Sequence, residues 1–310
     1  MDGGNETDVT YFILVGFSEH PKAQVIFFCF LLMSYLITLI GNSLILFLIH
    51  YDSRLHTPMY FFLSNLSFLD ICYTSSSVPQ VLINCLVKIP SISLGQCLAQ
   101  MCAGLYFGVA ECLLLAVMAY DRCIAIGDPL RYSVRMSSQL CLKLAVASWV
   151  TAFLLTVVPT LTMPLEFCGH HMINHFSCEL LAILKRACND LKFYEWLMMA
   201  TSSLTLLAPF TFILSSYGRI LRAVLKMHSA EGRKKAFSTC SSHITVVVIF
   251  YGTAISAYMI PQDKASQDQD KIISLLYGIL PPMLNPLIYS LRNKDVKEAL
   301  RKLMGEKNIS

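Results

Sequence analysis

Seven long apolar runs limit what this chain can fold into more than any other feature. A helix needs about 20 apolar residues to cross a hydrocarbon core roughly 30 Å thick. Runs this continuous predict helices, because the strands of a membrane barrel alternate between apolar and polar residues over about ten positions. The runs cover residues 25–49, 59–83, 98–120, 140–164, 193–214, 237–260 and 272–291.

The low share of charged residues supports the same fold. Charged residues make up 14% of the 310 residues, against roughly 25% in an ordinary soluble domain, and apolar residues make up 55%. We therefore predict an all-α membrane protein with a single seven-transmembrane helix bundle at 25–291. The two halves show no internal repeat, which argues against a transporter built from inverted repeats.

The distribution of Lys and Arg predicts the orientation in the membrane. If the N-terminus is outside, 17 of these residues fall on the inside segments and 7 on the outside ones, and cytoplasmic loops carry the excess. We expect a multi-pass plasma-membrane protein with residues 1–24 extracellular and the tail 292–310 cytoplasmic. The net charge of +4 then reflects this topology and predicts no nucleic-acid partner.

Two terminal features follow from this topology. The sequence Asn5-Glu6-Thr7 is a glycosylation signal on the outer segment, so Asn5 is the expected acceptor. In the tail, apolar residues recur at helical spacing opposite a face of Lys and Arg, which predicts a short amphipathic helix on the inner lipid surface. These residues are Val296, Ala299, Leu300, Leu303 and Met304.

Four of the 12 cysteines stand at the outer side of the predicted bundle. Cys97 opens the third run, and Cys168, Cys178 and Cys188 share the long outer segment 165–192. The outside is oxidising, and four cysteines allow three pairings that spacing does not distinguish. His170, His171 and His175 could join a thiolate at a metal site, but a disulfide at Cys178 would remove that ligand, so ordinary loop roles are favoured.

Four short motifs lie at the ends of the predicted helices. Asp121 and Arg122 follow the third run, where a charged pair is costly unless it faces water or a partner. The others read LHTPMY at 55–60, KAFSTCSSH at 235–243 and PMLNPLIYS at 282–290. Together they resemble the signature of the vertebrate olfactory receptors, which are odorant-sensing, rhodopsin-like G-protein-coupled receptors. The resemblance runs from about Phe12 to Leu303.

The resemblance implies a disulfide pattern and a switch. It favours Cys97–Cys178, which leaves Cys168–Cys188, while Cys97–Cys188 stays open as an alternative. In the resting state Asp121 would hold the guanidinium of Arg122, which on opening would cap the C-terminus of a partner helix. The remaining switch residues implied in this way are Tyr217, His243, Asn285, Pro286 and Tyr289.

The chain departs from the family pattern in the inner loop and in the sixth helix. Cys123 stands where Tyr is common, and Gly127-Asp128 replaces a usual Cys-x, which adds an acid and a flexible residue that bear on coupling. The tryptophan of the sixth helix in other rhodopsin-like receptors is absent, so Tyr251 is the candidate trigger under the ligand.

Two carboxylates lie within predicted spans. Asp70 and Glu111 are costly in a bilayer unless protonated or paired. The resemblance places Asp70 with Asn42 and Asn285 in a cluster that holds a sodium ion in many rhodopsin-like receptors, and Glu111 would add an oxygen ligand. The alternative is a protonated, hydrogen-bonded acid that only packs helices. No other cofactor is expected.

The resemblance also implies a ligand pocket, apolar with a few hydroxyls and without charge. Such a lining suits a small neutral volatile, which at about ten heavy atoms would bind by about 4–6 kcal/mol. The pocket residues implied are Gly104, Leu105, Gly108, Val109 and Cys112 on the third helix; Thr201, Ser202 and Thr205 on the fifth; and Tyr251, Ala254, Ile255 and Tyr258 on the sixth.

These observations predict an odorant receptor that activates a heterotrimeric G protein of the stimulatory, olfactory type and raises cyclic AMP. The nearest alternative is a G-protein-coupled receptor for a non-odorant small molecule outside the nose. A transporter or channel would need a continuous polar path, and only the Asp70–Glu111 pair hints at one. An enzyme is not expected, because Ser242-His243 has no orienting acid nearby in sequence.

Overall fold

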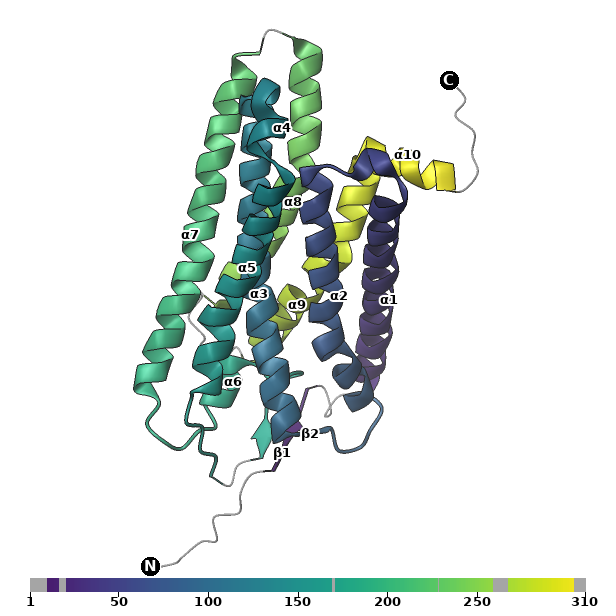
Figure 1. Ribbon diagram of the computed structural model, residues 1–310. Coiled ribbons are helices and arrows are strands. Elements are labelled where there is room, and N and C mark those ends of the chain that lie inside the picture. The colour runs from purple at the N-terminus through teal and green to yellow at the C-terminus, as the bar shows by residue number, and fades with distance from the viewer. Residues whose placement is uncertain (1–9, 17–20, 169–170, 228, 259–266, 304–310) are drawn as a thin grey trace, which may run out of the picture.

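Seven long helices form one bundle in the computed structural model, which describes residues 10–16, 21–168, 171–227, 229–258 and 267–303 (Figure 1). Short helical segments occupy the connections. The long helices are α1 (Pro21–Tyr51), α2 (Pro58–Asn84), α3 (Leu94–Gly127), α5 (Ser138–Leu161), α7 (Lys192–Leu225), α8 (Ala230–Tyr258) and α9 (Gln267–Arg292). The short ones are η1 (Ser53–Leu55), η2 (Pro129–Arg131), α4 (Tyr132–Arg135), α6 (Leu180–Leu184) and α10 (Lys294–Leu303).

Five of the described helices are long and apolar enough to cross a membrane on composition alone: α1, α3, α5, α7 and α9. The apolar part of α8 is shorter, at Cys240–Ser256, because this helix begins with a charged turn. Polar residues dilute α2, but Asp70 and Thr74 are buried and face other helices. The neighbouring helices therefore cover the polar residues of α2. Hydropathy alone does not take this burial into account.

Two helices extend well beyond their apolar runs. The apolar runs predict that the fifth helix ends at residue 214 and that the sixth begins at residue 237. In the structure α7 continues to Leu225 and α8 begins at Ala230. The hydropathy pattern stops where the membrane does. Ala, Leu, Arg and Lys are strong helix formers, so the backbone remains helical past that point.

One end of the bundle, called here the disulfide end, carries both disulfides and a small sheet. Strand β1 (Tyr11–Leu14) pairs antiparallel with β2 (Ser91–Ser93) and parallel with β3 (Met172–Ile173). The disulfides are Cys97–Cys178 and Cys168–Cys188, so the alternative Cys97–Cys188 pairing is not the one formed. The sheet is an addition to the predicted all-α architecture, because strands this short leave no periodic signal in the sequence.

The opposite end, called here the arginine end, carries Arg122 and α10. After α9 the chain turns, and α10 runs sideways from the bundle (Figure 1). Val296 and Ala299 are buried against the bundle, whereas Leu303 is 38% exposed, and Met304 lies outside the described residues. The predicted amphipathic helix therefore shares its apolar face between the bundle and its surroundings.

A glycine allows close contact between α1 and α9. A Cβ atom on Gly41 of α1 would lie 2.8 Å from the ring of Pro286 in α9. Only a residue without a side chain allows this approach. The contact brings Asn42, the next residue, to the Pro282 carbonyl, to which its amide donates at 3.2 Å.

Candidate ligand cavity and switch residues

A cavity of about 560 Å³ lies at the disulfide end among five helices. Most of its walls are apolar, with a few hydroxyl groups. The lining residues are Gly104, Leu105, Gly108, Val109 and Cys112 of α3; Leu180, Leu181 and Leu184 of α6, with Lys185; Glu195, Met198, Met199, Ser202, Ser203, Thr205 and Leu206 of α7; Ala254 of α8; and Tyr277 of α9.

Most of the predicted pocket residues line this cavity, including all five on α3. Three do not. The Thr201 hydroxyl donates to the Leu197 carbonyl of its own helix at 2.9 Å, and Ile255 packs against the core. Tyr251 is 1% exposed and packs against the ring of Phe210 at 4.8 Å. The side chain of Tyr258 lies outside the described residues.

The expectation of an uncharged lining was wrong at two positions. Lys185 and Glu195 both line the cavity, and both are exposed. The contributions of α6 and of Tyr277 were also missed. A loop helix carries no motif, and the approach of α9 depends on the packing of the whole bundle, so no local signal in the sequence indicates them.

Two glycines on α3 shape the cavity floor differently. A Cβ atom on Gly104 would meet nothing within 4 Å. A Cβ atom on Gly108 would lie 2.8 Å from the Tyr277 hydroxyl. Gly104 therefore borders open space, whereas Gly108 provides the room that the Tyr277 side chain occupies.

A buried polar cluster lies between this cavity and the arginine end. The Asn285 amide donates to one carboxylate oxygen of Asp70 at 3.0 Å. Three further side-chain oxygens, Asn42 Oδ1, Asp70 Oδ1 and Glu111 Oε1, are buried without a hydrogen-bond partner. The structure thus brings the four predicted residues into one region and leaves oxygen atoms free there.

At the arginine end, Asp121 and Arg122 are both buried, at 1% and 5% exposure. Among the ion pairs of the described residues, none joins these two side chains, which differs from the expected resting pair. Asp121 instead accepts a hydrogen bond from the Tyr132 hydroxyl at 2.7 Å. Burial, followed by the Asp121 carboxylate, raises the pKa of Tyr132, so the phenol stays protonated and donates.

His243 bridges three helices beside Arg122. Its Nε2 lies 3.1 Å from the Leu115 carbonyl of α3, and its Nδ1 lies 2.7 Å from the Tyr217 hydroxyl of α7. A carbonyl only accepts, so Nε2 carries the proton, and in the neutral ring Nδ1 accepts from Tyr217. Tyr217 is therefore bonded to His243 and not to Arg122, and the Tyr289 hydroxyl is buried without a partner.

Charged and polar side chains attach α10 to the connection after α1. Arg54 binds Asp52 at 2.7 Å and Glu298 of α10 at 3.2 Å. The hydrogen bond from Arg54 lowers the pKa of Asp52 to about 2. The Tyr60 hydroxyl lies 2.9 Å from an Asp295 carboxylate oxygen of α10. The motif at 55–60 thus meets the start of α10.

The connection between α3 and α5 presents apolar side chains outward. Leu130 is 95% exposed and Val134 is 79% exposed. Asp128, the acid that departs from the family pattern, lies 3.5 Å from Arg135. Its charge is therefore offset within the same connection.

The remaining predicted sites fall in the outer segments. Asn5 and His170 lie outside the described residues. His175 lies 3.6 Å from Glu179, and Cys178 is in a disulfide. The described residues contain no group of three or more His, Cys, Asp or Glu placed to hold a metal ion.

Comparison with solved structures identifies the fold. Squid rhodopsin superposes with a TM-score of 0.73 over 92% of this chain and 86% of its own, at 18% sequence identity. The seven long helices are thus arranged as in rhodopsin.

Sequence comparisons define the family. The olfactory receptor family model matches residues 28–307. Human olfactory receptor 13H1 is 54% identical over 97% of both chains. Human olfactory receptor 2K2 is 50% identical, covering 99% of this chain and 97% of its own, and the dog olfactory receptor-like protein OLF3 is 48% identical with the same coverage. The chain belongs to the olfactory receptor family, which confirms the resemblance, and members of this family are receptors and not enzymes.

Proposed function

We propose that the protein binds small neutral volatile molecules in the cavity and activates a stimulatory, olfactory-type G protein, which raises cyclic AMP. The cavity of about 560 Å³ is the observation that carries this proposal. Its lining is mostly apolar with hydroxyls from Ser202, Ser203 and Thr205, and its two charged residues are exposed. Such a site favours recognition by shape, with a few polar contacts that orient the ligand.

The orientation follows from the positive-inside rule. The disulfide end would face outside the plasma membrane, with Asn5 available for glycosylation, and the arginine end would face the cytoplasm. There, Leu130 and Val134 are apolar side chains that water would not favour, so they suit the surface of a G protein. The lysine and arginine face of α10 suits anionic lipid.

Activation requires the buried arginine to become available. Arg122 is 5% exposed, and the Tyr217–His243 bond ties α7 to α8 beside it. We assign this closed arrangement to the resting state. A bound ligand would shift the equilibrium toward a state in which the bond breaks and Arg122 meets the partner.

The test is a cyclic AMP assay in cells that express the receptor and its trafficking helpers. A panel of neutral volatiles should contain agonists that raise cyclic AMP in a dose-dependent way, and Arg122→Ala should abolish the response while surface expression persists. Silence across the panel with the receptor at the surface would contradict the proposed ligand class. A response retained by Arg122→Ala would contradict the proposed switch.

We also propose a sodium ion at the polar cluster. The free oxygens of Asn42, Asp70 and Glu111 are the hard ligands that such an ion prefers. Replacing sodium with choline should lower the melting temperature of the purified receptor, and Glu111→Gln should remove this dependence. An equal melting temperature in both salts would leave the pair as protonated packing residues.

A further inference from the structure

Closure of the disulfide end raises the question of how a ligand reaches the cavity. Strand β1 lies between β2 and β3 across this end, and Phe12 is fully buried beneath it. The backbone amide of Cys178, itself in a disulfide to α3, donates to the Gln100 side chain at 2.8 Å. Backbone pairing and covalent bonds hold this cover together, so it opens only at considerable cost.

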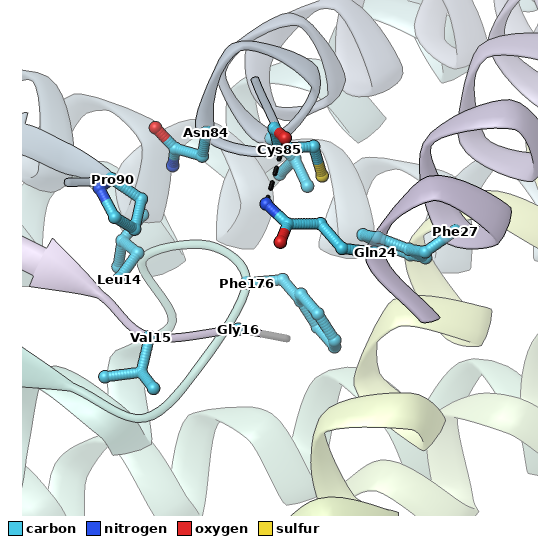
Figure 2. Close-up of a pocket in the computed structure, with 10 residues that line it drawn as sticks. Leu14, Val15, Gly16, Gln24, Phe27, Asn84, Cys85, Pro90 and Phe176 are labelled. Carbon is cyan, nitrogen blue, oxygen red and sulfur yellow. Dashed lines mark hydrogen bonds between the residues drawn. The ribbon is translucent and has the colours of Figure 1, made fainter. Parts of the chain in front are cut away.

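The gap beside the cover is also too small for a ligand. Figure 2 shows it between Gly16, the end of α2 and the start of α1. The Gln24 side chain donates to the Cys85 carbonyl at 2.9 Å, and the rings of Phe27 and Phe176 are 4.8 Å apart. The space that remains is about 20 Å³, which holds little more than one water molecule.

The exposure of two lining residues indicates instead an opening on the side of the bundle, between α6 and α7. Met199 of α7 lines it and is nevertheless 61% exposed, and Leu181 of α6 lines it and is 40% exposed. Both side chains are apolar. Lining residues with this much exposed surface indicate an opening in the wall, called here the mouth, and the side chains around it suit lipid.

Neighbouring residues place the mouth near the border between lipid headgroups and acyl chains. Phe193 and Trp196 on the same turns of α7 are 70% and 72% exposed, and Trp is enriched at that border. Lys185 and Glu195 at the mouth are exposed polar groups of the kind that headgroups and water solvate. The charges thus lie at the rim, while the interior stays apolar.

We propose that ligands reach the cavity through this mouth from the outer part of the bilayer, and that the receptor favours bulky neutral molecules that partition into lipid. The cavity volume supports a bulky ligand. About 560 Å³ lies in the range of cavities that hold drug-sized ligands and exceeds the volume of the smallest volatiles. The ligand class rests on the proposed function of the same cavity. The access path rests on the mouth alone.

The test uses a thiol placed inside the cavity, so it needs neither a known agonist nor a signalling response. Gly104→Cys adds a side chain into open space. Receptor in lipid nanodiscs is treated with N-phenylmaleimide, which enters lipid, or with a sulfonated maleimide, which does not, and peptide mass spectrometry follows modification at position 104. Ser91→Cys, at an exposed residue of β2, normalises the reactivity of the two reagents.

After normalisation, N-phenylmaleimide should modify Gly104→Cys at least about tenfold faster than the charged reagent, because only the former concentrates at an apolar mouth. Adding Met199→Trp should slow this modification several-fold by filling the mouth, and Leu181→Trp should do the same from α6. Leu204→Trp is the matched control, since Leu204 is 60% exposed on the same helix but does not line the cavity.

Three results would overturn the access path. Equal normalised rates for the two reagents would indicate entry from water. Equal slowing by Leu204→Trp and Met199→Trp would remove the role of the mouth. Absence of modification by either reagent, with the thiol reactive after unfolding in detergent, would show that the cavity is closed. None of these results depends on cyclic AMP, so they are separable from failure of the proposed function.

Discussion

At the disulfide end, two covalent bonds and a three-stranded sheet join segments that lie far apart in the sequence. At the arginine end, comparable joins are made by side chains, such as Tyr132 to Asp121 and Tyr217 to His243. A single hydrogen bond contributes about 1 kcal/mol net, so such joins exchange readily. The comparison indicates that one end preserves the shape of a cavity while the other is able to change partners.

The largest effect should come from breaking the cover. Cys97→Ser should greatly reduce folded receptor at the cell surface, because the Cys97–Cys178 bond closes a separation of 81 residues. The chain-entropy model gives about 4–5 kcal/mol for such a loop and about 3 kcal/mol for the 20-residue separation of Cys168–Cys188. Surface antibody labelling checks this, with Cys188→Ser as the milder comparison. A larger loss of surface receptor for Cys188→Ser than for Cys97→Ser would contradict the assignment of the larger stabilisation to the Cys97–Cys178 bond.

The cavity floor should respond next. Gly108→Ala should lower agonist potency about tenfold, since the new methyl group displaces the Tyr277 hydroxyl and overpacking costs about 1–3 kcal/mol. Gly104→Ala is the matched control and should change potency by less than about threefold. Dose–response curves for an agonist from the panel measure both. Equal losses would mean that the ligand occupies the space beside Gly104, because an added methyl group meets no protein atom there.

A smaller effect is expected at the switch. Tyr217→Phe removes the hydroxyl that binds His243 and leaves a buried acceptor without a donor, which weakens the closed arrangement by about 1 kcal/mol. Basal cyclic AMP should rise about fivefold at equal surface expression. Tyr35→Phe, which removes a hydroxyl contact with Ser75 at 3.0 Å, should leave it unchanged. A fall in basal signalling would assign Tyr217 to the active state.

The smallest effect concerns the attachment of α10. Asp52→Asn should lower the melting temperature of the purified receptor by about 1–2 °C, by weakening the hold on Arg54. The pKa of Asp52 is lowered from 3.8 to about 2, so its contribution is complete above pH 3.8 and is lost as the pH falls through 2. The difference from wild type should therefore be constant between pH 5 and 8, and a change across that window would point to another group. Glu298→Gln, at an exposed partner of Arg54, should have less effect.

The sequence predicted the features that depend on composition and local pattern. The seven apolar runs and the motif around Arg122 indicated the bundle and the family, and the family resemblance implied that Gly104, Gly108 and Cys112 face the pocket, where they line the cavity. What was missed depends on contacts between distant segments. Tyr277 and the α6 residues reach the cavity only because the bundle and the second disulfide position them, and the Asp121–Tyr132 bond joins residues that no periodicity relates.

The position of β1 has a consequence for biosynthesis. This strand leaves the ribosome before the other elements of the cover, but its partner strands lie at Ser91–Ser93 and Met172–Ile173, so the sheet forms only after four of the seven long helices have been made. Until then Phe12 and Leu14 have nothing to pack against in the sheet. A nascent chain that stalls would display these two side chains, which gives cellular quality control a direct signal of an unfinished receptor.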